Sequence, residues 1–132
     1  MVRLAMQGND IPCRKYEIAD SEGISGDYVE QILIRLKAAG LVESHRGSKG
    51  GFTINGSPES ITVADVLTAS EGPVAIAPCT MGECSRKTDC VTRLIWNEAE
   101  HAISDVLGRH TIAQLAERTN SICDEISGSK DD

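Results

Sequence analysis

Three cysteines lie within one polar segment, with four residues between Cys79 and Cys84 and five between Cys84 and Cys90. Thiolates are soft ligands that hold iron–sulfur clusters and other thiophilic metals. Cys-x2-Cys turns suit a tetrahedral zinc site, whereas these wider gaps, filled by small and polar residues, allow a flexible loop to enclose a larger group. We therefore expect the three thiols to hold an iron–sulfur cluster.

The spacing of these cysteines leaves other interpretations open. The alternatives are a zinc site, a reversible disulfide switch, and three unrelated thiols in a mobile loop. Cys13 and Cys123 are expected to be small buried or half-buried side chains rather than ligands. A thiol enzyme is not expected, because no histidine or acidic residue stands in a fixed local relation to a cysteine within a glycine-framed turn.

Length and composition limit the class of protein. A chain of 132 residues fits one domain, or a small domain with a dimerising extension. One Trp, two Tyr and one Phe leave the core to aliphatic residues, which suits helices packed on helices. No apolar run approaches the roughly 20 residues of a membrane span and no leader sequence is visible, so we expect a soluble, cytoplasmic protein with reduced thiols.

The net charge of −7 is unevenly distributed along the chain. Residues 1–57 hold seven Lys/Arg and seven Asp/Glu, whereas residues 58–132 hold six and thirteen. A nucleic-acid binder normally carries a basic face. The acidity of the whole chain therefore counts against DNA binding, and only the locally neutral N-terminal half leaves that role open.

The N-terminal half has the pattern of a winged helix-turn-helix. A first helix is predicted over residues 1–7, and its start is expected to be missing. A short helix is predicted over 14–21. A tight turn then leads to a helix over 26–39, whose apolar residues recur at helical spacing. Two strand-like runs, 41–46 and 52–54, flank a glycine-rich tip and predict a hairpin that would form the wing.

The C-terminal half is predicted to be helical. A capping-box signature precedes a short helix ending near Ser70, and a long helix over 91–107 carries a broad apolar stripe that needs a partner. A last helix over 112–126 is followed by a polar tail, residues 128–132. The expected fold is mainly α with a small β wing, in which the long helix mediates dimerisation.

We expect three functional regions along the chain. Residues 1–72 form the winged helix-turn-helix DNA-binding domain, residues 73–90 the cysteine segment, and residues 91–127 the dimerisation helix with the C-terminal helix. The second helix of a helix-turn-helix enters the major groove, and a wing can reach the minor groove or the phosphates. The DNA-contacting residues expected from these positions are Ser25, Asp27, Tyr28, Glu30, Gln31, Arg46 and Lys49. Position alone leaves open that Glu30 and Gln31 are ordinary solvated helix residues.

The order of these parts resembles the IscR-like and NsrR-like winged-helix transcription regulators over nearly the whole chain. The matching stretches are Glu22 to Ser25, Tyr28 to Leu33, Leu36 to Val42, Arg46-Gly47, Gly50 to Phe52 and the three cysteines. The resemblance implies a homodimer that binds a double-stranded DNA operator, with a 2Fe-2S or 4Fe-4S cluster tuning its affinity in response to iron, redox state or nitric oxide. The alternative is a winged-helix regulator with a zinc or thiol–disulfide switch and no cluster.

The chain departs from this family pattern at the fourth cluster ligand. In the IscR-like branch that ligand is a histidine three residues after the last cysteine, and Arg93 occupies the position here. A protonated guanidinium has no lone pair to donate to a metal. In the NsrR-like branch the ligand is an acidic residue near the partner's N-terminus. Because we expect this sequence to begin inside the first helix, that candidate is not visible.

Overall fold

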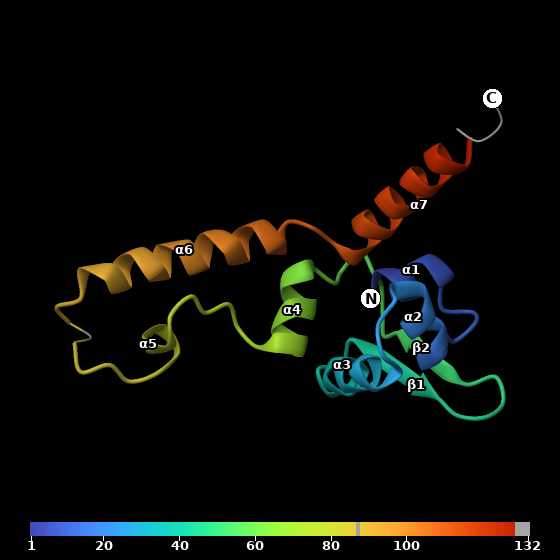
Figure 1. The fold of residues 1–132 in the computed structure, drawn as a ribbon, viewed down its shortest axis with the longest axis horizontal. Helices are drawn as coiled ribbons and strands as arrows, with labels where there is room; N and C mark the ends of the chain where they lie inside the picture. Colours follow the sequence, from blue (N-terminus) through green and yellow to red (C-terminus); the bar gives the residue numbers. More distant parts are fainter. Residues whose placement is uncertain (87, 129–132) are drawn as a thin grey trace.

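The computed structural model describes residues 1–86 and 88–128, and within them the chain forms seven helices and one two-stranded sheet (Figure 1). In chain order the elements are α1 (Val2–Gln7), α2 (Lys15–Glu22), α3 (Gly26–Ala38), β1 (Val42–His45), β2 (Gly51–Ile54), α4 (Val63–Glu71), α5 (Pro78–Met81), α6 (Val91–Gly108) and α7 (Ile112–Gly128). The mainly helical fold with a small β wing is thus confirmed. The predicted polar tail lies, from residue 129 onward, outside the described residues.

Helix α3 is held in the body of the molecule by its apolar side. Ser25 caps its first turn, because the Ser25 Oγ accepts a hydrogen bond from the backbone N–H of Tyr28 at 3.2 Å. Val29, Leu33 and Leu36 are buried in the core together with side chains of α1, α2, β1 and β2. The opposite side of α3 is exposed to solvent.

The wing is an antiparallel hairpin in the predicted place. Its register pairs Val42 with Ile54 and His45 with Gly51. Beside β2, the backbone of Cys13 exchanges two hydrogen bonds with Phe52, at 2.9 and 2.8 Å, which extends the sheet by one isolated bridge. The base of the wing is therefore joined to the segment that leads into α2.

The C-terminal helix α7 returns to the winged-helix body, which the sequence pattern did not reveal. Its first turn pairs with the strand-like segment before α4: the N–H of Ile112 donates to the carbonyl of Ile61 at 2.8 Å, and the N–H of Val63 donates to the carbonyl of His110 at 2.9 Å. Helix α7 then packs against α1, and Ile112 and Ala116 become buried.

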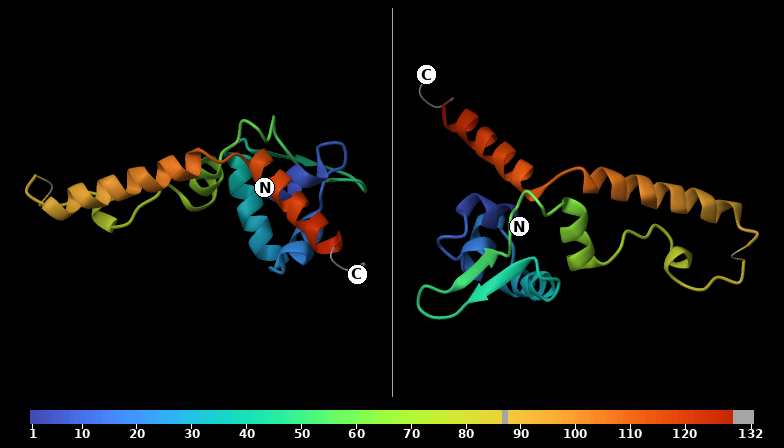
Figure 2. Two further views of the ribbon diagram at one scale, coloured as in Figure 1. Left: turned by 90° about the horizontal axis from the view of Figure 1, so that it is seen from above. Right: turned by 180° about the vertical axis from the view of Figure 1, so that it is seen from behind.

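Helix α6 extends away from the winged-helix body as an arm, and the cysteine segment lies at its far end (Figures 1 and 2). The arm contacts α4 near the body and the one-turn helix α5 near its tip. No residue of α6 is buried, and five of its large apolar side chains are exposed: Val91, Leu94, Ile95, Ile103 and Val106. Trp96 and Leu107 are half-buried. No helix among the described residues is both long and apolar enough to cross a membrane.

Candidate functional site

The three cysteines of the segment occupy three different backbone settings. Cys79 lies within α5, Cys84 in the loop that follows, and Cys90 is the N-cap residue of α6. All three are half-buried free thiols, whereas Cys13 is fully buried and Cys123 is exposed on α7. The expectation that Cys13 is a packing residue agrees with this burial, which also raises the pKa of its thiol. The same expectation for Cys123 was wrong, because its side chain is exposed.

Glu100 of α6 fastens the cysteine segment to the arm. One oxygen of its carboxylate, Oε1, accepts hydrogen bonds from the backbone N–H of Ile76 at 2.8 Å and from the hydroxyl of Thr80 at 2.6 Å. These two donors stabilise the charged form, so the pKa of Glu100 lies below its ordinary value, with the Thr80 hydroxyl as the larger cause. The residue next to Cys79 is thereby tied to α6.

Arg93 lies one turn into α6, beside Cys90. The two residues share the lining of a surface hollow with Thr88, Asp89, Val91, Leu94 and Asn97. The Nη1 atom of Arg93 is buried and has no hydrogen-bond partner among the described residues. A cationic donor without a partner next to a cysteine fits an anionic group held by thiolates.

The structure does not gather the three thiols around one point. Among residues 1–86 and 88–128, no group of three or more His, Cys, Asp and Glu side chains is close enough to hold a metal ion. Three half-buried free thiols are the type of ligand that holds an iron–sulfur cluster, and the Arg93 guanidinium is a hydrogen-bond donor suited to the negative charge of such a group. Binding one would require this segment to rearrange.

The predicted DNA-contacting residues of α3 all lie on its solvent side. Ser25 is the N-cap; Asp27 and Tyr28 stand in the first turn and Glu30 and Gln31 in the second, and all five are exposed. The hydroxyl of Ser25 already accepts the capping hydrogen bond, which leaves its proton for a phosphate oxygen. The arrangement presents polar donors and acceptors along the first two turns.

The predicted wing residues are exposed as well. Arg46 follows β1 directly and Lys49 lies in the tip between the strands. The guanidinium of Arg14, which precedes α2, donates a hydrogen bond to the carbonyl of Ser48 in the same tip. The cations of the wing therefore stand on a loop that is tied to the start of the helix-turn-helix.

Two contacts of α3 with other elements carry no local sequence signal. The ammonium of Lys15 lies 2.7 Å from a carboxylate oxygen of Glu30, and the guanidinium of Arg35 donates to the carbonyl of Ser70 at the end of α4, at 2.6 Å. Each joins residues at least fifteen positions apart, so only the folded chain reveals them.

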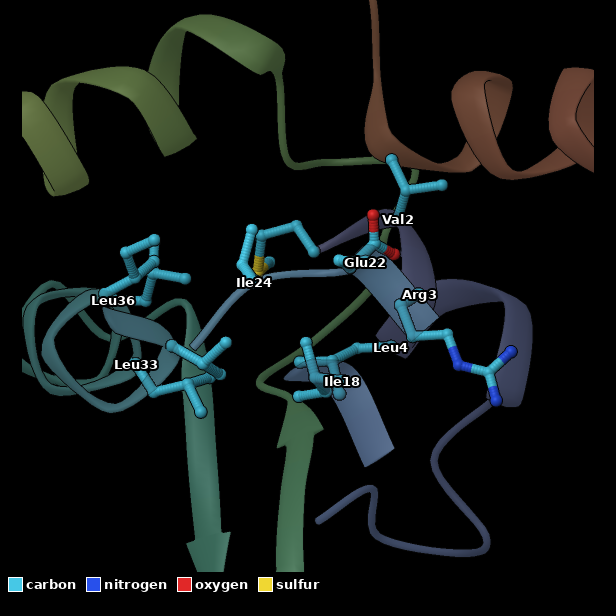
Figure 3. Close-up of a pocket in the computed structure, with 11 residues that line it drawn as sticks. Val2, Arg3, Leu4, Ile18, Glu22, Ile24, Leu33 and Leu36 are labelled. Atoms are coloured by element: carbon cyan, nitrogen blue, oxygen red, sulfur yellow. The ribbon is translucent and has the colours of Figure 1, made fainter. Parts of the chain in front are cut away.

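A separate cavity of about 290 Å³ lies among α1, α2 and α3. Figure 3 shows Leu4, Ile18 and Leu33 directed toward this space, while the guanidinium of Arg3 points away from it. None of the cysteines of the segment and none of the predicted DNA-contacting residues lines the cavity. It is distinct from both candidate sites.

Comparison with known proteins gives one consistent family. The family model described as Rrf2, iron-dependent transcriptional regulator, matches residues 1–118. The chain is 33% identical over 132 residues to the HTH-type transcriptional regulator IscR of Vibrio campbellii, covering 99% of this chain and 77% of that protein.

Solved structures agree with this result. The structure of CymR, the global cysteine regulator of B. subtilis, is similar with a TM-score of 0.73 and 30% identity, over 89% of this chain and 87% of that one. The structure of T. potens IscR is similar with a TM-score of 0.72 and 29% identity, over 89% of this chain and 78% of that one.

Proposed function

Because this chain belongs to the Rrf2 family of DNA-binding transcriptional regulators, we propose that it is a homodimeric, operator-binding regulator whose DNA affinity is set by an iron–sulfur cluster. In this proposal Cys79, Cys84 and Cys90 hold the cluster. The winged helix over residues 1–72 binds the operator.

One observation carries the proposal: three half-buried free thiols lie in a short segment whose described residues are hydrogen-bonded to the arm and not to α3 or the wing. When bound, a cluster supplies a redox-active, metal-containing centre that reacts to oxidants, nitric oxide or iron supply. The Arg93 donor offsets part of the negative charge of such a group. Arg93 itself is no ligand, so the fourth ligand must come from another residue, an exogenous group or the partner chain.

Homodimerisation through α6 is supported by its uncovered apolar side. The exposed fractions of Val91, Leu94, Ile95, Ile103 and Val106 lie between 41% and 72%. Part of this side forms a shallow hollow lined by Ala102, Ile103, Val106 and Leu107. A helix with such a stripe is stable in water when a second apolar surface covers it. A second copy of α6 supplies that surface and places two recognition helices on one operator.

A continuous set of contacts is available to relay the state of the cysteine segment to DNA. Glu100 ties the segment to α6, α6 packs against α4, and Arg35 ties the end of α4 to α3. Ordering the segment around a ligand would fix the pose of α6 and, through α4, bias the spacing of the two recognition helices. Loss of the ligand would release that bias.

The experiment is anaerobic purification of the protein with measurement of visible absorption, iron, sulfide and zinc. The proposal expects a brown protein with absorption near 400 nm and stoichiometric iron and sulfide. Cys84→Ala is expected to lose both the colour and the cluster-dependent change in operator affinity, whereas Cys123→Ala, at an exposed cysteine of α7, keeps both. A colourless wild-type protein without iron would refute the cluster.

A second candidate is a regulator with a zinc or thiol–disulfide switch. It is favoured by the separate placement of the three thiols, which the described residues do not assemble into a metal site, and by the similarity to CymR. In that case oxidation by diamide would change operator affinity in the iron-free protein and would be reversed by dithiothreitol. Stoichiometric zinc in the colourless protein would identify the zinc form.

A further inference from the structure

Three consecutive residues before and at the start of α2 contact both DNA-reading elements. Cys13 pairs by its backbone with Phe52 of β2, and Arg14 donates to the carbonyl of Ser48 in the wing tip. Lys15 reaches in the other direction, to Glu30 in the second turn of α3. This short segment therefore sits between the wing and the recognition helix and touches each of them.

The contact between Lys15 and Glu30 is the one ion pair found among the described residues. Its Nζ–Oε2 distance is 2.7 Å, and the ammonium also stands 5.2 Å from the centre of the Tyr16 ring, where a cation is attracted to the π face. The Lys15 side chain is 26% exposed and that of Glu30 is 47% exposed. Lys15 is therefore the more firmly held member of the pair.

Glu30 is held by only one of its two carboxylate oxygens. Within the described residues Oε2 meets Lys15, and Oε1 makes no hydrogen bond. A carboxylate on a recognition helix can accept a hydrogen bond from the amino group of cytosine in the major groove. The free oxygen is the atom available for that contact.

We propose that Lys15 is a positioning residue that sets the base specificity of Glu30. An unpaired glutamate on a helix surface samples several rotamers, and its charge is repelled by the phosphates on both sides of the groove. Lys15 restricts the carboxylate to one orientation and offsets its charge. Oε1 can then face the bases with a smaller loss of side-chain entropy and with weaker repulsion from the phosphates. The inference rests on the proposed reading of DNA by Glu30.

The alternative is that Lys15 releases Glu30 and binds a DNA phosphate. The two roles have different effects on operator affinity, its salt dependence and base preference. A phosphate contact alters affinity for all sequences alike and contributes about 0.9 to the slope of log K against log salt, whereas a residue that positions a base reader alters the preference at one base pair of each half-site.

The test begins with a library of DNA duplexes whose central sequence is randomised. Duplexes that bind the full wild-type chain are selected from it. The recovered sequence then serves as the probe for Lys15→Met, Glu30→Gln, the double variant, Lys15→Arg and the matched surface control Lys49→Met. Affinities are measured for the probe and for its single-base-pair variants, each at several salt concentrations.

The proposal expects Lys15→Met to lower discrimination at the base pair that Glu30→Gln affects, by about fivefold or more, with an unchanged salt slope. Lys15→Met should add nothing in the Glu30→Gln background, and Lys15→Arg should retain the preference because it keeps the charge. Lys49→Met should weaken all sequences equally.

Two results would overturn the inference while leaving the proposed function intact: a uniform loss of affinity with a reduced salt slope in Lys15→Met, or an unchanged base preference. If the wild-type chain enriched no sequence, the proposed operator binding would fail first and the role of Lys15 with it.

Discussion

The hydroxyl of Thr80 donates a hydrogen bond of 2.6 Å to the carboxylate of Glu100, and this links the cysteine segment to the arm. The same hydroxyl lies 2.7 Å from the carbonyl of Ala77, but that carbonyl already accepts the backbone N–H of Thr80 at 3.0 Å. A hydroxyl has one proton, and an ionised carboxylate is the stronger acceptor. The link to Glu100 therefore takes precedence while Glu100 is charged.

Glu100→Gln should loosen the cysteine segment without unfolding the protein. A neutral amide accepts more weakly than a carboxylate, so the hydrogen bonds from Ile76 and Thr80 lose strength. Amide hydrogen exchange of residues 76–81 is expected to accelerate severalfold, with unchanged exchange in α3. Glu98→Gln, one exposed carboxylate earlier on the same helix, is the control. Equal protection of the segment in both variants would show that Glu100 does not anchor it.

The anchor should also depend on pH, in a direction set by Glu100. Its pKa is depressed by the Thr80 hydroxyl and the Ile76 N–H, so the anchoring is complete above the ordinary glutamate value of about 4.3 and is lost as the pH falls through the lower, folded value. NMR titration of the side-chain carboxyl carbon measures this directly. A titration midpoint at or above the ordinary value would contradict the hydrogen-bonded geometry.

The parts of this fold that the sequence predicted are those with strong local signals. The apolar spacing of Val29, Ile32, Leu33 and Leu36 predicted helix α3. Three of these side chains are buried, and Ile32 is half-buried. The glycine-rich tip between two short β-type runs predicted the wing. The capping box predicted before α4 is formed by Thr62 and Asp65: the N–H of Thr62 donates to the Asp65 carboxylate at 2.9 Å, and the N–H of Asp65 donates to the Thr62 hydroxyl oxygen at 3.1 Å.

What could not be predicted depends on contacts between distant residues. Nothing in the amphipathic pattern of α7 says that it packs on α1, because the same apolar stripe would fit a partner helix equally well. The one-turn helix α5 was missed because four residues carry no periodicity. The pairs Lys15–Glu30 and Thr80–Glu100 join surface polar residues fifteen and twenty positions apart, and surface polar residues look alike in a sequence.

The same limit applies to the candidate sites themselves. Residue type and spacing selected Cys79, Cys84 and Cys90, and their half-buried state is compatible with ligation. Their assignment as ligands, and that of Arg46 and Lys49 as DNA contacts, stays a prediction. The chemistry of a thiolate site depends on how the loop folds around a bound metal or cluster. The pattern of residues along the chain does not contain that information.

Ile95→Asp should weaken the proposed homodimer. Ile95 is 57% exposed at the centre of the apolar side of α6, and burying it in a dimer contributes about 1.5–3 kcal/mol from each copy. Losing both contributions raises the dimer dissociation constant at least about a hundredfold. Sedimentation equilibrium measures this constant. Ile11→Asp, at a 68% exposed isoleucine in the loop before α2, is the control; the same effect in both variants would exclude α6 as the specific interface.

Gly51→Ala should destabilise the junction between the wing and the segment before α2. Gly51 has a φ of +156°, and a Cβ atom there would stand 2.6 Å from the carbonyl oxygen of Cys13. The clash and the backbone strain are expected to cost on the order of 2–3 kcal/mol. Gly56→Ala, also at positive φ but with open space around its Cβ, should cost about 1 kcal/mol. Urea denaturation compares the two free energies of unfolding, and equal losses would refute the close packing of Gly51 on Cys13.

Arg46→Ala should lower operator affinity by about 1–3 kcal/mol. Arg46 is exposed directly after β1, where a wing can place a guanidinium in a narrow minor groove whose negative potential is enhanced. In a chain of net charge −7, binding to a polyanion depends on such local cations, so wild-type affinity should also fall steeply as salt rises.

Arg118→Ala, which removes the same charge from the exposed side of α7, is the matched control in an electrophoretic mobility shift assay. Because both variants make the chain equally more acidic, a loss confined to Arg46→Ala assigns the effect to the wing, and an equal loss in both would assign it to net charge alone.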